Sequence, residues 1–253
     1  MKNYKSVLIT GGAQRIGESI AKHLGQAGYN VAIQFNRSSK KALLLKKYFN
    51  NLGVQFGSFK FNLEEDEKIE DFYHNIIENF GGIDILINNA SIFDFDTITN
   101  SNKKIFDRHI NVNLKAPFFL SQNFIKYLGK KNGLIINIID QRVKNITPYF
   151  TSYTLSKSAL YTLTKSLSLS LAPRIRVNGI SPGPTLISKN QNLSQFKKQI
   201  LRTPLRRQVD LSEINNAIDY LIKNKSVTGE MLTIDSGQSL GWAHSKSTVF
   251  SND

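Results

Sequence analysis

The chain has 253 residues, and 33 Lys and Arg against 19 Asp and Glu give it a formal net charge of +14. Because 40% of the residues are hydrophobic, intrinsic disorder is excluded for most of the chain. No apolar run approaches the roughly 18 residues that a membrane helix needs, so we expect no membrane partner. The absence of cysteine excludes disulfides and thiolate sites and fits a cytoplasmic location.

The excess of positive charge raises the question of a nucleic-acid partner. The lysines are scattered, often in pairs such as Lys40-Lys41 and Lys197-Lys198, and no block of five like charges occurs. Scattered pairs are typical of a solvated surface, so we expect no nucleic acid among the partners. A continuous basic stripe on the folded surface would instead favour a non-catalytic module that binds nucleic acid or senses dinucleotides.

Short apolar runs alternate with helical patterns along the whole chain. In chain order, the pattern predicts a strand at 7–9, a helix from 16 to 24 closed by Gly28, a strand at 30–35, a helix at 41–52, a strand at 54–61, a helix at 66–80, a strand at 83–87, a helix at 103–128 bent at Pro117, a strand at 134–139, a helix at 153–171, a strand at 175–180, a weak helix at 193–201 and a strand at 231–234.

Each predicted strand is apolar on both faces, which indicates a parallel sheet covered by helices on both sides. We therefore expect an α/β fold of the Rossmann type, doubly wound, with about seven parallel strands. No linker divides the chain, so residues 1–243 are expected to form one domain and 244–253 a flexible tail. The irregular segment 184–207 follows a strand, where a substrate-binding loop is expected.

A glycine turn joins the first strand to the first helix, where backbone N–H groups and the helix dipole favour a pyrophosphate. The end of the second strand then distinguishes two dinucleotides. A carboxylate there would bind the ribose 2′-OH of NAD, but the run is Asn36-Arg37-Ser38. A guanidinium beside a hydroxyl suits a 2′-phosphate, so we expect NADPH. The alternative interpretation makes Arg37 an ordinary surface cation.

Tyr153 and Lys157 lie four residues apart, on one face of a predicted helix. A cation at that position can lower the pKa of a phenol and make it a proton donor near neutral pH. The spacing also occurs at Tyr127/Lys131 and Tyr161/Lys165. Only the pair Tyr153/Lys157 falls in the first turns of a helix that follows a strand, where ligands bind in such folds.

The ordered set of motifs resembles the short-chain dehydrogenase/reductase family over about residues 5–242. The motifs are Thr10-Gly11-Gly12-Ala13-Gln14-Arg15-Ile16-Gly17, Asn88-Asn89-Ala90-Ser91, Asn113, Tyr153-x-x-x-Lys157 and Ser181-Pro182-Gly183. The resemblance implies that Tyr153 donates a proton, that Lys157 holds the ribose and lowers the Tyr153 pKa, and that Asn113 supports a water relay. The cofactor residues that it implies are Gly11, Arg15, Ile16, Gly17, Asn36, Arg37, Ser38, Asn62, Leu63, Asn89, Ala90, Ser91, Lys157, Pro182, Gly183 and Thr185.

Three departures from the family pattern resemble the pteridine reductases and the bacterial dihydromonapterin and dihydrofolate reductases. Arg15 and Ser91 stand where glycines are usual, and Asp140 stands where a serine is usual. A carboxylate suits a substrate with N–H donors or a ring nitrogen that takes a proton. Phe93 matches the aromatic residue that stacks on the pterin in that group. The implied substrate residues are Ser91, Phe93, Asp140 and Tyr153.

These observations predict an NADPH-dependent reductase of a dihydropterin or dihydrofolate, with Tyr153 and Asp140 supplying the proton. The main alternative is a carbonyl reductase of the same family that acts on 3-oxoacyl thioesters or sugars. Each of four residues also has a structural interpretation. Asp140 is alternatively a capping carboxylate and Phe93 a residue of ordinary loop packing. Asn113 alternatively only bridges backbone groups inside its helix, and Arg15 is alternatively exposed instead of bound to phosphate. We predict no metal, and by analogy a homotetramer, in which Trp242 is a candidate to reach a neighbouring site.

Overall fold

All seven predicted strands form in the computed structural model, which describes residues 5–241. They build one sheet in the order β3-β2-β1-β4-β5-β6-β7, and every neighbouring pair is parallel. The predicted doubly wound fold is therefore confirmed. The strands are β1 Ser6–Thr10, β2 Asn30–Phe35, β3 Phe56–Lys60, β4 Ile85–Asn88, β5 Gly133–Ile138, β6 Ile175–Pro182 and β7 Met231–Ile234.

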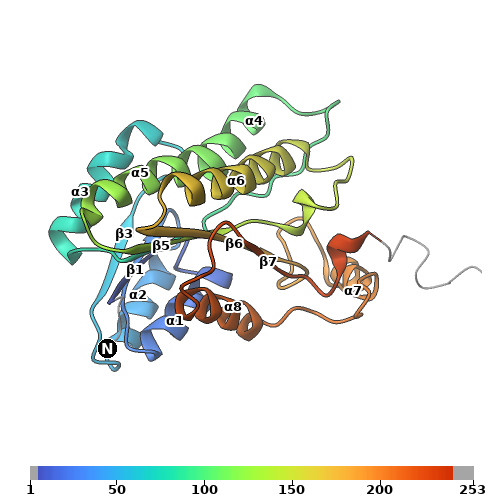
Figure 1. The fold of residues 1–253 in the computed structure, drawn as a ribbon. Coiled ribbons are helices and arrows are strands. Elements are labelled where there is room, and N and C mark those ends of the chain that lie inside the picture. The colour runs from blue at the N-terminus through green and yellow to red at the C-terminus, as the bar shows by residue number, and fades with distance from the viewer. Residues whose placement is uncertain (1–4, 242–253) are drawn as a thin grey trace, which may run out of the picture.

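Helices cover both faces of the sheet, with α3, α5 and α6 on one face and α1, α2 and α8 on the other (Figure 1). Each face packs against its own apolar cluster, so the central strands are buried on both sides. The helices are α1 Arg15–Gln26, α2 Ser39–Phe49, α3 Ile69–Phe80, α4 Lys103–Ile110, α5 Ala116–Leu128, α6 Thr151–Ser170, α7 Leu193–Leu201 and α8 Leu211–Lys223, with short 3-10 turns η1 Asp66–Lys68, η3 Gln141–Val143 and η4 Gln238–Leu240.

The helix predicted over 103–128 is interrupted earlier than expected. Between α4 and α5 the chain forms one wide π turn, η2 Asn111–Lys115, in which the Ala116 N–H bonds to the carbonyl of Asn111. Pro117 has no N–H, so it cannot donate to the carbonyl of Asn113 four residues earlier. The irregular turn therefore lies just before the proline and contains Asn113.

Helix α8 was absent from the sequence prediction, although its start carries a recognisable signal. The Asp210 carboxylate accepts from Ser212 N at 2.7 Å, and Glu213 Oε2 accepts from Asp210 N at 2.8 Å. This pairing is a capping box, and buried residues follow it at helical spacing. The helix buries Ile214, Ala217, Ile218, Leu221 and Ile222 against the sheet.

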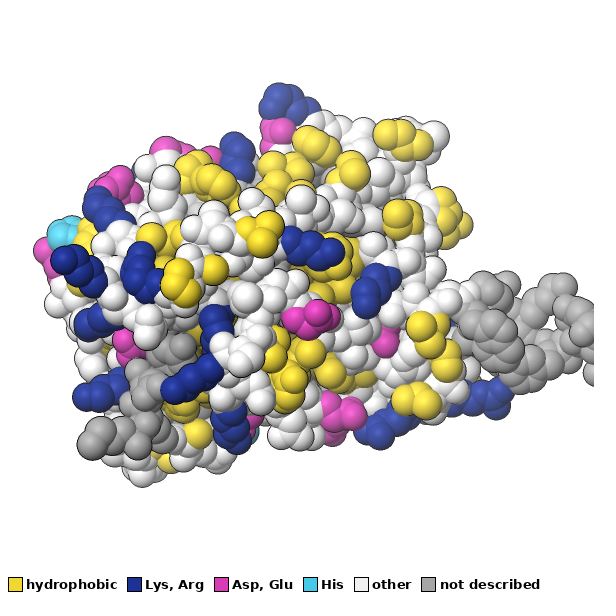
Figure 2. All heavy atoms as spheres, viewed as in Figure 1, with side chains coloured by type: hydrophobic (Ala, Val, Ile, Leu, Met, Phe, Trp, Pro, Cys, Tyr) yellow, Lys and Arg dark blue, Asp and Glu magenta, His cyan; other side chains and the backbone are white. Residues whose placement is uncertain are grey.

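The surface charges and the helix lengths bear on the expected partners. On the face drawn in Figure 2, Lys and Arg side chains are dispersed among acidic, apolar and neutral ones, so this face carries no continuous basic stripe within 5–241. No helix of the described chain is long and apolar enough to cross a bilayer. The predicted tail at 244–253 and Trp242 lie outside the described residues.

Candidate active site

The carboxyl ends of six strands surround one cavity of about 670 Å³. All of the predicted cofactor and substrate residues line it. Asn113 is the one predicted site residue outside the lining, and it is fully buried behind it. Within residues 5–241, no cluster of His, Asp and Glu has an arrangement that would hold a metal ion.

The turn between β1 and α1 lines part of this cavity. Gly11 has a φ of +62° and its N–H donates to Gln34 Oε1 at 2.9 Å. A Cβ on Gly17 would lie 2.4 Å from the Gly11 carbonyl oxygen, so the turn has no space for a larger residue there. No side chain caps the N-terminus of α1. Its first N–H groups and its positive dipole end therefore suit a phosphate, and this part of the site fits a dinucleotide.

Arg15 adopts a φ of +56°, a left-handed conformation that explains why glycine is usual at its position. Its guanidinium donates to the carbonyls of Ile187 at 2.9 Å and Leu186 at 3.2 Å. The residue expected at a cofactor phosphate therefore also holds the segment that follows β6. Sequence reasoning missed this contact, because the two ends lie 172 positions apart.

Beside the turn between β1 and α1, Arg37 and Ser38 follow β2, the neighbour of β1, and line the cavity wall. Asn36 Nδ2 donates to Asn62 Oδ1 at 3.0 Å, so the loops after β2 and β3 are tied together. The wall offers a cation and a hydroxyl at the predicted 2′-phosphate position.

Tyr153 lies near the start of α6, and its hydroxyl donates to Asp140 Oδ2 at 2.7 Å. The other oxygen of Asp140 accepts from Arg142 N at 2.8 Å, which caps η3. Asp140 therefore caps η3 with one oxygen and contacts the Tyr153 hydroxyl with the other. The cap fixes its position, and its second oxygen faces the phenol.

The expected lowering of the Tyr153 pKa is wrong for this arrangement. Burial raises the pKa of Tyr153 well above its usual value, and the Asp140 carboxylate raises it further. Arg142 and Ser91 act to lower the Tyr153 pKa, but burial and Asp140 outweigh them. The Nζ of Lys157 donates to the carbonyl of Ile138 at 2.8 Å. Burial also lowers the pKa of Lys157 to about 8. At neutral pH the site therefore holds a protonated phenol near a buried lysine that is still mostly cationic.

Asn113 clamps the loop after β4 from inside the π turn. Its Oδ1 accepts from Ile92 N at 2.9 Å and Ser91 Oγ at 3.1 Å, and its Nδ2 donates to Ile92 O at 3.1 Å and Ser156 Oγ at 3.0 Å. These contacts reach α6 at Ser156, one residue before Lys157. The expected contribution of Asn113 to a water relay stays a prediction. The alternative interpretation, a bridge between backbone groups inside its own helix, is wrong, because the backbone groups that Asn113 contacts belong to Ile92 in the loop after β4.

Phe93 lines the cavity and also packs against its neighbours. It stacks on Phe150 with ring centroids 4.1 Å apart and meets Tyr153 edge-on at 4.6 Å. The Arg142 guanidinium lies 4.9 Å from the centroid of Phe150 and 5.6 Å from that of Phe93. One face of Phe93 is thus covered by protein, and the aromatic group stands directly beside the phenol.

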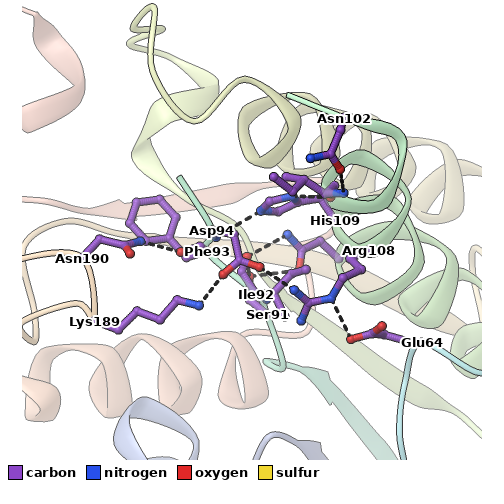
Figure 3. Close-up of polar contacts among 12 residues, drawn as sticks. Glu64, Ser91, Ile92, Phe93, Asp94, Asn102, Arg108, His109, Lys189 and Asn190 are labelled. Carbon is purple, nitrogen blue, oxygen red and sulfur yellow. Dashed lines mark hydrogen bonds and ion pairs between the residues drawn. The ribbon is translucent and has the colours of Figure 1, made fainter. Parts of the chain in front are cut away.

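A charged network that the sequence did not indicate holds the next residue, Asp94 (Figure 3). Arg108 donates to Asp94 at 2.8 Å and to Glu64 at 3.1 Å, and Lys189 also pairs with Asp94. Burial opposes ionisation of Asp94, but the ion pairs with Lys189 and Arg108 outweigh it and lower its pKa. The network joins the loop after β4 to α4 and to the segment after β6.

His109 of α4 also contacts the loop that carries Asp94 (Figure 3). Its Nδ1 lies 2.9 Å from the carbonyl of Ile105, to which it donates, so Nε2 accepts from Asp94 N at 3.2 Å. Burial lowers the pKa of His109, which favours this neutral ring. Asn190 Nδ2 also donates to the carbonyl of Phe93 at 2.7 Å. The loop that carries Phe93 is therefore held from both sides.

Comparison with known proteins gives the chain a family. Residues 5–198 match the family model of the short chain dehydrogenases. The 3-oxoacyl-acyl-carrier-protein reductase FabG of Staphylococcus epidermidis is 30% identical over 239 residues, which cover 92% of this chain and 98% of that protein. FabG of Buchnera aphidicola subsp. Baizongia pistaciae is 32% identical over 246 residues, which cover 94% and 98%.

Two solved structures are more similar in sequence. The FolM alternative dihydrofolate reductase 1 of Brucella suis, in complex with NADP, is 41% identical with a TM-score of 0.91, covering 96% of this chain and 98% of that one. Its counterpart from Brucella canis, complexed with NADP, is 40% identical with a TM-score of 0.92 and covers 96% of each chain. The family model, the curated relatives and the fold agree, and the chain belongs to the short-chain dehydrogenase family.

Proposed function

We propose that this protein reduces a dihydropterin or a dihydrofolate-type substrate with NADPH. The observation that carries the proposal is the Asp140 carboxylate within 2.7 Å of the Tyr153 hydroxyl. A carboxylate at this place accepts hydrogen bonds from N–H groups and can pass a proton to a ring nitrogen. A ketone oxygen would instead need a hydrogen-bond donor at this place. The 40–41% identity to two FolM structures that contain NADP supports the same conclusion.

A second candidate is the reduction of 3-oxoacyl thioesters. The curated relatives favour it, since several are FabG proteins at 30–32% identity. The substrate wall opposes it, because Asp140 presents an acceptor where a thioester ketone would need a hydrogen-bond donor beside Tyr153.

NADPH, when bound, supplies the hydride. The residues of the cavity fit it: the uncapped N-terminus of α1 would bind the pyrophosphate, Arg37 and Ser38 the 2′-phosphate, and Lys157 the ribose next to the reacting centre. Tyr153 would hold the proton that the substrate receives. Asp140 would orient the phenol and accept from the substrate ring, and Phe93 would pack on the pterin plane.

The direct test is oxidation of NADPH by the purified protein, followed by absorbance. Dihydromonapterin, dihydrobiopterin and dihydrofolate are compared with 3-oxoacyl thioesters at equal concentrations. We expect turnover with at least one pterin or folate and none with the thioesters. Turnover with the thioesters and none with the pterins or folate would overturn the proposal in favour of the second candidate.

The cofactor preference rests on Arg37. Removal of a charge-assisted contact to the 2′-phosphate in Arg37→Ala should raise KM for NADPH roughly 10- to 100-fold and leave KM for NADH unchanged. Lys40→Ala is the control, because Lys40 is an exposed cation in the first turn of α2 that does not line the cavity. Equal effects of the two substitutions on NADPH would show that Arg37 acts only through general charge.

We further propose a homotetramer in the cytoplasm. Large apolar side chains are exposed along α4, α5 and α6, which suits contact between subunits. They are Phe106, Phe118, Leu155 and Leu169. Light scattering coupled to size-exclusion chromatography tests the assembly, and a monomer at assay concentration would contradict it. The cytoplasmic location stays a prediction.

A further inference from the structure

The helix that carries Tyr153 does not cap its own N-terminus. The N-cap residue of α6 is Phe150, which has a φ of +59° and no polar side-chain atom. Helices α4, α7 and α8 are instead capped by their own N-cap side chains, those of Asn102, Asn192 and Asp210. The first N–H groups of α6 therefore take their acceptor from another part of the chain.

That acceptor is Asp96, a fully buried residue of the loop after β4 that does not line the cavity. Both of its carboxylate oxygens accept from Ser152 N at 3.2 Å. Its Oδ2 also accepts from the hydroxyl of Ser152 and, at 2.8 Å, from that of Ser101. The backbone carbonyl of Asp96 accepts from Phe150 N at 2.7 Å. Asp96 thus holds both the N-cap residue and the second residue of α6, 56 positions further along the chain.

These contacts fix the first turn of α6 relative to the loop that carries Phe93. Tyr153 is the residue directly after the capped serine, and its hydroxyl donates to Asp140 Oδ2 at 2.7 Å. Phe150, which the carbonyl of Asp96 holds, stacks on Phe93 at 4.1 Å, and Phe93 meets the Tyr153 ring edge-on at 4.6 Å. A shift of this turn would therefore move the phenol relative to Asp140 and to the aromatic group at the same time.

We propose that Asp96 is a positioning residue, which holds the Tyr153 hydroxyl in place by capping α6 from the loop after β4. It acts through Ser152 and Phe150 and contacts no group that reacts. The inference rests on the part of the proposed function that makes Tyr153 the proton donor, and it holds for any substrate that this site reduces. Displacement of a reacting group by about 1 Å can cost roughly 100-fold in rate, so this cap bears directly on turnover.

The first test observes the phenol directly by NMR and needs no substrate. Tyrosine is labelled with ¹³C at Cζ, and the Tyr153 signal of the full chain saturated with NADP⁺ is assigned by its loss in Tyr153→Phe. Asp96→Ala should move this signal toward the shift of an exposed tyrosine, because the hydroxyl loses its fixed contact with Asp140. Asp96→Asn keeps an oxygen that can accept from Ser152 N, so the signal should stay near its wild-type shift. An unchanged signal in Asp96→Ala would overturn the proposal.

Turnover gives the second test, with whichever of the compared substrates the wild type reduces. Asp96→Ala should lower kcat roughly 10- to 100-fold, and Asp96→Asn should restore most of it. Asp210→Ala is the matched control, because Asp210 accepts from the N–H of Ser212, the second residue of α8, at 2.7 Å and does not line the cavity. The control should lower the melting temperature but change neither kcat nor the Tyr153 signal.

Two outcomes of the kinetic test contradict the role of Asp96. They are a normal kcat in Asp96→Ala and an equal loss of kcat in Asp210→Ala. If Asp96→Ala does not fold, Ser152→Ala takes its place, since it removes one hydroxyl contact and keeps the cap. It should move the Tyr153 signal in the same direction by less, and no movement would again overturn the proposal. A wild type that reduces none of the compared substrates would contradict the proposed function, whereas the NMR comparison would still decide whether Asp96 holds the phenol.

Discussion

Replacement of Tyr153 by Phe should lower kcat for dihydropterin reduction by about 10²–10⁴, the range typical for the loss of a general acid. The substitution removes the hydroxyl that faces Asp140 and keeps the ring that packs on Phe93. Binding of NADPH should therefore change little. Steady-state kinetics at saturating cofactor measure the first effect, and titration of NADPH fluorescence measures the second.

A matched control exists on the same helix. Tyr161 and Lys165 repeat the spacing of Tyr153 and Lys157 two turns further on, with Lys165 Nζ 4.5 Å from the centroid of the Tyr161 ring, and neither lines the cavity. Tyr161→Phe should leave kcat unchanged. Near-wild-type turnover in Tyr153→Phe would show that the phenol is not the proton donor. If Asp140→Asn then lost most of its turnover, the carboxylate would be the proton donor instead.

Much of the fold follows from local pattern. Buried parallel strands are short, continuous apolar runs, so their positions are readable without the helices that cover them. The glycine turn, the end of β2 and the Tyr153/Lys157 pair are likewise local, because the residues that form each of them lie close together in the chain. Helix α8 was missed even though Asp210 and Glu213 form a local capping box. That omission came from the interpretation of the sequence, since the signal was present.

The rest of the site depends on contacts between distant segments. The pairing of Asp94 with Lys189 spans 95 positions, and the contact of Arg15 with Ile187 spans 172. No periodicity encodes such partners. The pKa of Tyr153 was mispredicted for a related reason: spacing along a helix shows that two side chains share a face, but not that both are buried or that Lys157 bonds to the carbonyl of Ile138. Burial, which raises the phenol pKa, is decided by the whole fold.

Lys157→Met should abolish reduction and at the same time stabilise the protein at pH 7. Lys157 is 2% exposed, and burial lowers its pKa from 10.5 to about 8. At pH 7 the folded protein therefore carries a buried cation that the unfolded chain would hydrate. The lowering corresponds to about 3 kcal/mol, since one pKa unit is worth about 1.36 kcal/mol. Met fills a similar volume without charge, although it leaves the carbonyl of Ile138 without this donor.

The dependence on pH gives the sharper measurement. Between pH 8 and 10.5 the unfolded chain binds a proton at Lys157 that the folded chain has released, so this residue makes the free energy of unfolding rise with pH over that range. The variant lacks that rise. Its stability advantage over the wild type in urea denaturation should therefore shrink by about 3 kcal/mol from pH 7 to pH 10.5.

The same titration should appear in catalysis. Wild-type kcat/KM should fall as the pH passes about 8, where Lys157 loses the charge with which it would hold the ribose. Lys165→Met is the control, because Lys165 is exposed at the equivalent spacing and should give a stability difference that does not change with pH. If the difference between Lys157→Met and the wild type were also constant with pH, the pKa of Lys157 would be the same in the folded and the unfolded chain, and the expected fall of kcat/KM near pH 8 would have no basis in this residue.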